Sequence, residues 1–127
     1  MPEIRVYGDD RFGGHSSMDD SILNTVKKML GLEADYTAFD TDIIVFINSA
    51  LMVLNQLGVG QSLRITGSTE TWASFLDGQE NLSSVKDLVY LRVRRVFDPP
   101  SSSSVLGSID SQISELEWRL NVFSDPV

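Results

Sequence analysis

The chain has 127 residues, of which 42% are hydrophobic and 22% are charged, a length and balance that suit one globular domain with its own core. It contains no cysteine, which excludes a disulfide framework, a thiolate zinc site and a cysteine nucleophile. A formal net charge of −8 makes the whole chain a poor candidate for sequence-independent DNA binding, which draws on clustered lysine and arginine.

The N-terminal segment is expected to be an appendage. Ile4 and Val6 alternate with Arg5 and Tyr7, as in a short strand, and three glycines at positions 8, 13 and 14 then interrupt regular structure. No apolar run follows a basic start, so no signal peptide is visible. The expected organisation is an arm (1–17), a helical domain (18–124) and a frayed C-terminus (125–127).

A first helix is predicted over residues 21–30, with apolar residues spaced to share one face. Asp19 or Asp20 is expected to cap its N-terminus, where a carboxylate also complements the helix dipole. Gly31 is the expected C-terminal cap.

A second helix is predicted over residues 41–57, with Asp40 as its N-cap. Its main apolar stripe includes Phe46 and Leu54, but four apolar residues fall outside that stripe: Ile44, Val45, Met52 and Val53. A helix that is apolar on most sides is buried on most sides. It is therefore either the central helix of the domain or a helix that meets another subunit.

Residues 59–81 form the irregular part of the chain. Leu63 and Ile65 alternate with polar residues, which favours a short strand or an extended loop, and Ser68 or Thr69 is expected to cap a brief helix after it. Aromatic residues gather on one side of this helix. The segment is either a compact aromatic plug or a projecting loop whose tip contacts a partner.

Two further helices follow. One is predicted over residues 81–98 and ends at Pro99, which cannot continue a helix. The other is predicted over residues 105–123 and carries one narrow apolar seam, with gaps of three and four residues, formed by Leu106, Ile109, Ile113, Leu116, Leu120 and Phe123. The predicted fold is therefore all-α, a small bundle of about four helices with a long irregular loop between the second and third.

Trp118 lies off this seam, flanked by Glu117 and Arg119. A tryptophan on an otherwise polar face is a candidate interface anchor. The alternative is that it packs beneath the loop of residues 59–81.

Charge is distributed unevenly along the chain. The acidic segment, residues 33–42, carries Glu33, Asp35, Asp40 and Asp42 without a basic residue. The basic segment, residues 86–95, carries Lys86, Arg92, Arg94 and Arg95 against a single aspartate. Three interpretations stay open: two solvated faces, a head-to-tail contact between identical subunits, or a surface that lines a DNA channel.

No pattern typical of catalysis, metal binding or cofactor binding stands out. His15 is the single histidine, and it lies among glycines and serines that offer no orienting partner. The acidic residues around Asp40 and Asp42 lack the glycine and the spaced glutamate of a calcium loop, and capping explains them. Gly58 and Gly60 lack the third glycine of a dinucleotide fingerprint. We expect no enzyme activity, no metal and no cofactor.

Several short stretches together carry a resemblance to a known family. They are Met18-Asp19-Asp20-Ser21-Ile22-Leu23, Tyr36-Thr37-Ala38-Phe39-Asp40-Thr41-Asp42-Ile43-Ile44, Asn48-Ser49-Ala50, Gln56-Leu57-Gly58-Val59-Gly60, Arg95-Val96-Phe97-Asp98-Pro99-Pro100 and Glu115-Leu116-Glu117-Trp118-Arg119-Leu120. In these the chain resembles the small head–tail connector proteins of tailed bacteriophages and prophages of Gram-positive bacteria, the adaptor or head-completion family. The resemblance covers about residues 18–124.

The resemblance implies a structural virion protein and not an enzyme. Such subunits form a ring, usually of twelve, beneath the portal protein of a DNA-filled head. The ring extends the channel for double-stranded DNA, without sequence specificity, and offers a surface for the stopper or tail-completion protein. The expected location is the head–tail interface of the virion, with the host cytoplasm before assembly and no membrane. The last helix is the expected portal contact.

Two other functions stay open on the residues alone. One is a helical protein-interaction or regulatory module that binds a partner through the apolar seam of the last helix. The other is a small helical domain that binds nucleic acid through the basic segment, with steeply salt-dependent affinity.

Overall fold

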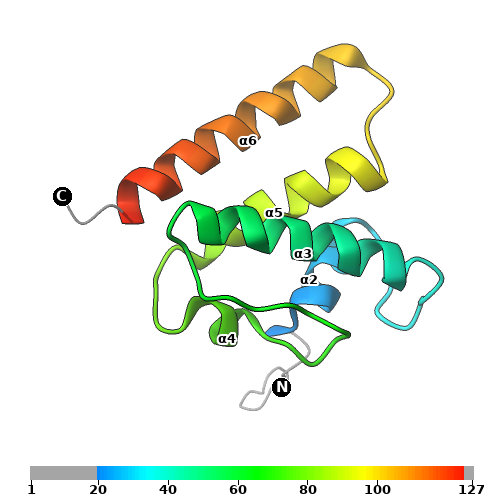
Figure 1. Cartoon of the computed structure of the whole chain (residues 1–127). Coiled ribbons are helices and arrows are strands. Elements are labelled where there is room, and N and C mark those ends of the chain that lie inside the picture. The colour runs from blue at the N-terminus through cyan, green and yellow to red at the C-terminus, as the bar shows by residue number, and fades with distance from the viewer. Residues whose placement is uncertain (1–19, 125–127) are drawn as a thin grey trace, which may run out of the picture.

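The computed structural model describes residues 20–124, which form helices joined by loops, without a β-sheet among them (Figure 1). The helices are α2 (Ile22–Met29), α3 (Asp40–Gln56), α4 (Trp72–Leu76), α5 (Leu82–Phe97) and α6 (Ser103–Ser124). Within the described residues, β-structure is limited to an isolated antiparallel bridge between Ser21 and Thr71. The all-α prediction is confirmed. The strand expected at residues 4–7 lies outside the described part of the chain.

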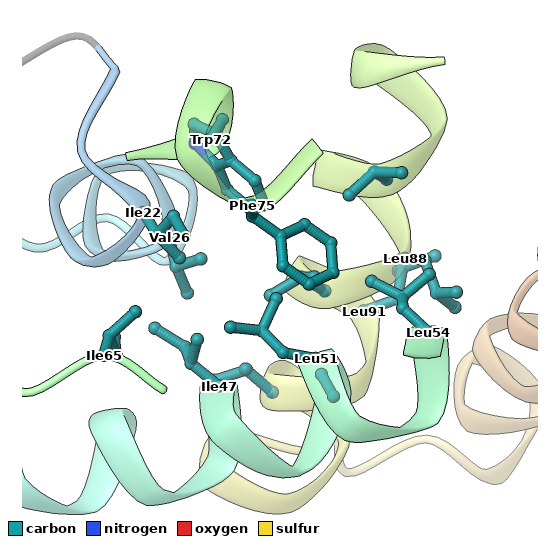
Figure 2. Close-up of a cluster of buried hydrophobic side chains, with 14 of the residues drawn as sticks. Ile22, Val26, Ile47, Leu51, Leu54, Ile65, Trp72, Phe75, Leu88 and Leu91 are labelled. Atoms are coloured by element: carbon teal, nitrogen blue, oxygen red, sulfur yellow. The ribbon is translucent and has the colours of Figure 1, made fainter. Parts of the chain in front are cut away.

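α3 and α5 are the central pair of the fold. They pack against each other, α2 contacts both, and α6 lies along α5 (Figure 1). The three apolar residues Ile47, Leu51 and Leu54 of α3 are fully buried in one core with Leu88 of α5, and Leu54 lies beside Leu88 (Figure 2). Of the two positions predicted for the second helix, the structure therefore shows the central one.

Two helix caps differ from the sequence prediction. Ser21, and neither Asp19 nor Asp20, caps α2: its side-chain oxygen accepts a hydrogen bond from the backbone N–H of Asn24 at 3.2 Å. Thr71, and neither Ser68 nor Thr69, caps α4 in the same way. In each case the residue directly before the helix provides the cap, because only that position places a side-chain oxygen over the exposed amides.

Asp40 is the first residue of α3 and not its N-cap. Its Oδ1 lies 2.8 Å from Nζ of Lys27, a side chain that is only 1% exposed. The same ammonium donates a hydrogen bond to the carbonyl of Ala34 at 2.9 Å. A buried charge must be paired and hydrogen-bonded to be tolerated, and Lys27 satisfies both conditions while it ties the α2–α3 connection to both helices.

α4 and its flanking loop form a plug over the core. Trp72 and Phe75 are fully buried and project from α4 toward α2 and α3 (Figure 2). The indole Nε1 of Trp72 donates a hydrogen bond to Thr25 Oγ1 at 3.1 Å, so the polar edge of this buried ring is satisfied. The aromatic-plug interpretation of this segment is the one that the burial supports.

Of the short strand or extended loop expected around Leu63 and Ile65, the structure shows the loop, and the side chain of Asn48 explains why. Its Nδ2 donates to the carbonyl of Ile65 at 3.1 Å, and its Oδ1 accepts from the backbone N–H of Ile65 at 2.8 Å. An asparagine on α3 thus occupies both backbone groups that a neighbouring strand would pair with. Ile65 is buried without any sheet.

Glu70 organises the other end of this loop. Its carboxylate accepts hydrogen bonds from the backbone N–H and the hydroxyl of Thr66 at 3.0 and 2.9 Å. Partial burial raises the pKa of Glu70, but hydrogen bonds from Thr66, from Gly67 and from its own backbone outweigh this effect, so the pKa lies below its ordinary value of 4.5.

We expect Glu70→Gln to destabilise the protein at neutral pH and to lose this effect in acid. Because the folded-state pKa is depressed, the ionised carboxylate stabilises the fold above its unfolded pKa, by about 1 kcal/mol or less at this solvated site. This contribution disappears as the pH falls through the folded-state pKa. Urea unfolding of both forms at pH 7 and pH 3 measures it, and a difference that persists unchanged at pH 3 would contradict the assignment.

Candidate protein-interaction surfaces

α6 is an outer helix held along one face. Ile109, Ile113 and Leu120 of its seam are buried, at 3%, 7% and 3% exposed, in the apolar core. Leu106 and Leu116 are half-buried. At the far end, the hydroxyl of Ser124 donates a hydrogen bond to the carbonyl of Leu57 at 2.7 Å. Most of the predicted seam therefore serves to hold α6 on its own subunit.

Two of the four basic residues of the basic segment form ion pairs with α6. Arg92 Nη1 lies 2.6 Å from Glu117 Oε2, and Arg95 Nε lies 2.5 Å from Asp110 Oδ1. A second guanidinium nitrogen of Arg95 donates to Asp110 Oδ2 at 3.3 Å, which makes this pair bidentate. These two charges fix the register of α6 on α5.

Arg94 and Lys86 are less neutralised within the subunit than Arg92 and Arg95, so more of their positive charge is available to another molecule. Arg94 donates a hydrogen bond to the Tyr90 hydroxyl at 3.3 Å, a neutral acceptor. Lys86 has no ion-pair partner among residues 20–124 and lines a groove beside Lys28 and Glu33. The positive potential of the basic segment is therefore smaller than the sequence alone indicates.

The acidic segment also contains both carboxylates that are paired within the subunit and carboxylates that are not. Asp40 is paired with the buried Lys27, whereas Glu33, Asp35 and Asp42 are exposed. These three carboxylates have no ion-pair partner within the described part of the chain. They, and not Asp40, are the ones that can meet another molecule.

Trp118 lies on the outer face of α6 and is 67% exposed. Val122, one turn later, is 52% exposed, and the neighbouring Phe123 is 61% exposed. Glu115 and Arg119, on either side of Trp118 in the sequence, form an ion pair with each other at 2.6 Å. Trp118 does not pack beneath the loop of residues 59–81, and Trp118 and Val122, four residues apart on one exposed helix face, are typical of a binding surface.

A comparison with protein-family models identifies the chain. The model of the phage connector proteins matches residues 22–127, which includes every helix from α2 to α6. The chain belongs to the phage connector protein family. The connector is therefore a structural component of the phage, as the resemblance implied. Neither the curated proteins nor the solved structures include a significant match to it.

The structure adds two surfaces of the connector that the sequence did not reveal. One is a groove of about 360 Å³ between α3 and residues 62–64, beside the exposed Val45 and Met52. The other is a groove of about 420 Å³ between α2, α5 and α6. The sequence did place Val45 and Met52 among the apolar residues outside the main stripe. It could not reveal the groove itself, because a groove depends on how separate segments pack in the folded chain.

The described part of the connector offers no cluster of side chains that could hold a metal ion. Across residues 20–124, no three histidine, cysteine, aspartate or glutamate side chains converge to hold a metal ion. Gly60 lies against the ring of Phe75 and does not belong to a phosphate-binding loop. His15 lies outside the described residues. None of the described helices is both long and apolar enough to cross a bilayer.

Proposed function

We propose that this connector is an adaptor of the head–tail junction. Twelve subunits form a ring beneath the portal protein, extend the channel for double-stranded DNA, and offer a docking surface for the stopper or tail-completion protein. The family match over residues 22–127 is the observation that carries this proposal. The domain that assembles is the helical domain from residue 18 to residue 124, with residues 1–17 as an arm.

The outer face of α6 is the proposed portal contact. It offers Trp118 and Val122 to a partner, while the buried Ile109 and Leu120 hold the helix in place. Burial of an exposed tryptophan is among the largest single contributions to protein–protein affinity. A helix anchored by its own subunit presents these side chains without a large loss of conformational entropy on binding.

The unpaired charges have a supporting role in this proposal. Glu33, Asp35 and Asp42 on one side, and Lys86 and Arg94 on the other, are available for contacts between neighbouring subunits or for the wall of the channel. A net charge of −8 per chain limits adhesion of passing DNA, which suits a conduit better than a DNA-binding protein.

Electron microscopy of particles from a phage or induced prophage that lacks this gene tests the proposal. DNA-filled or leaking heads beside separate, normal tails are expected, and the purified connector should restore their joining. Intact infectious virions would refute the adaptor role and would favour a helical regulatory module instead. Steeply salt-dependent DNA binding by the isolated chain would favour a nucleic-acid-binding domain.

We expect Trp118→Ala to leave the connector folded and to impair head completion. The side chain is mostly solvent-exposed in the free subunit, so its removal costs little stability. Loss of a central aromatic anchor costs about 2 kcal/mol or more per contact, which weakens each contact about 30-fold. The measurement is the titre of joined particles after add-back of the variant.

Val105→Ala is the matched control, because Val105 is 44% exposed at the other end of the same helix. It should complete heads as the native connector does. Circular dichroism must show native helicity for both variants. If Trp118→Ala completes heads normally, the outer face of α6 is not the portal contact.

A further inference from the structure

The outer face of α3 presents an apolar ridge that the subunit itself does not cover. Val45 and Met52, two turns apart, are 55% and 58% exposed, with Ser49 between them. These three residues form one wall of a groove that residues 62–64 close from the other side. We call Val45, Ser49 and Met52 the α3 ridge.

A second groove lies on other helices of the subunit. Its apolar walls are Met29 of α2, Tyr90 and Leu91 of α5, and Leu116 of α6. We call these four residues the α5 groove. Its volume of about 420 Å³ is ample for two aliphatic side chains. The α3 ridge and the α5 groove share no helix.

Each surface carries one charge that is unpaired among residues 20–124, and the two charges are opposite. Arg64 lines the groove beside the α3 ridge, and Asp87 lines the α5 groove. The other charged residues of the α5 groove, Glu115 and Arg119, neutralise each other. Opposite unpaired charges at the edges of a ridge and a groove are what a complementary contact requires.

We propose that a second copy of this chain occupies the α5 groove: its α3 ridge inserts Val45 and Met52 among Met29, Tyr90, Leu91 and Leu116, and its Arg64 pairs with Asp87. This inference rests on the proposed function and specifies its lateral contact. Because two different surfaces meet, the contact is heterologous, and repetition around a closed rotation generates a ring. The outer face of α6 stays free for the portal.

Disulfide cross-linking tests this pairing cleanly, because the native chain contains no cysteine. Met52→Cys and Met29→Cys place one thiol on the α3 ridge and one at the α5 groove, at positions that are 58% and 36% exposed. The two variants are mixed, as purified protein at high concentration and in assembled particles, and are oxidised.

A covalent dimer that forms in the mixture, and not with either variant alone, is the expected result. Dimers of Met52→Cys with itself would indicate a symmetric contact between two ridges and would overturn the proposal. Absence of the mixed dimer from both the purified protein and the particles would overturn it as well.

Charge reversal supplies an independent readout. Arg64→Glu and Asp87→Arg should each raise the concentration needed for assembly about tenfold, the effect of 1.4 kcal/mol, and the double variant should restore assembly. Lys28→Glu, which changes an exposed lysine outside both surfaces, is the control. If the double variant is as defective as the two single variants combined, Arg64 does not meet Asp87.

These outcomes separate the two proposals. Failed cross-linking and failed rescue, together with unjoined heads in the gene deletion, would remove the proposed contact and leave the adaptor role intact. A gene deletion without any effect on head completion would remove the adaptor role itself.

Discussion

Replacement of Gly60 by alanine is expected to destabilise the connector by about 2–5 kcal/mol. Gly60 has a φ of +73°, where an L side chain is strained, and an added Cβ would lie 2.3 Å from Cζ of Phe75. Phe75 is fully buried and cannot withdraw without opening the core. Chemical unfolding followed by circular dichroism measures the loss.

Gly31→Ala is the matched control for this substitution. Gly31 has a similar φ of +88°, but an added Cβ would meet nothing within 4 Å. It should therefore show only the backbone cost, about 1–2 kcal/mol. An equal cost at both glycines would mean that the contact between Gly60 and the aromatic ring relaxes freely, and that the plug packs more loosely than the structure shows.

Trp72→Ala is expected to destabilise the connector by about 3–5 kcal/mol. The side chain is the largest that is fully buried, and it fills the space between α4 and α2 (Figure 2). Trp72→Phe keeps an aromatic ring but removes the hydrogen bond to Thr25, and we expect it to cost about 1–2 kcal/mol. Unfolding in urea, with the same circular dichroism signal, compares the three proteins.

Tryptophan fluorescence gives a control for this experiment. The chain has two tryptophans, the buried Trp72 and the exposed Trp118. Acrylamide should quench the remaining fluorescence of Trp72→Ala strongly, and that of Trp118→Ala weakly. If Trp72→Ala keeps native stability, α4 covers the core without contributing to its stability.

The sequence predicted the helices well because their signals are local. Apolar spacing locates α3 and α5, and the proline after Asp98 marks the end of α5 at Phe97. The choice between a strand and an extended loop near Ile65 stayed open because the partner of this segment is the side chain of Asn48, 17 residues earlier. Alternation of apolar residues cannot reveal such a partner.

The candidate site was harder to predict because charge pairing depends on tertiary register. Arg95 meets Asp110 and Arg92 meets Glu117, 15 and 25 residues away, only once α6 is laid along α5. The sequence therefore overstated the free positive charge of the basic segment. The exposure of Trp118 likewise follows from which face of α6 the buried seam selects.

The way in which α6 is attached has a mechanical consequence. Its contacts are one apolar seam, two ion pairs and two terminal hydrogen bonds to the carbonyl of Leu57, whereas α3 and α5 form the central pair of the subunit and share its buried core. Partial opening of an outer element costs only a fraction of the global unfolding free energy. The subunit is thus stiff at its centre and compliant at one edge, so it can absorb small misfits with a neighbouring protein while its core keeps its shape.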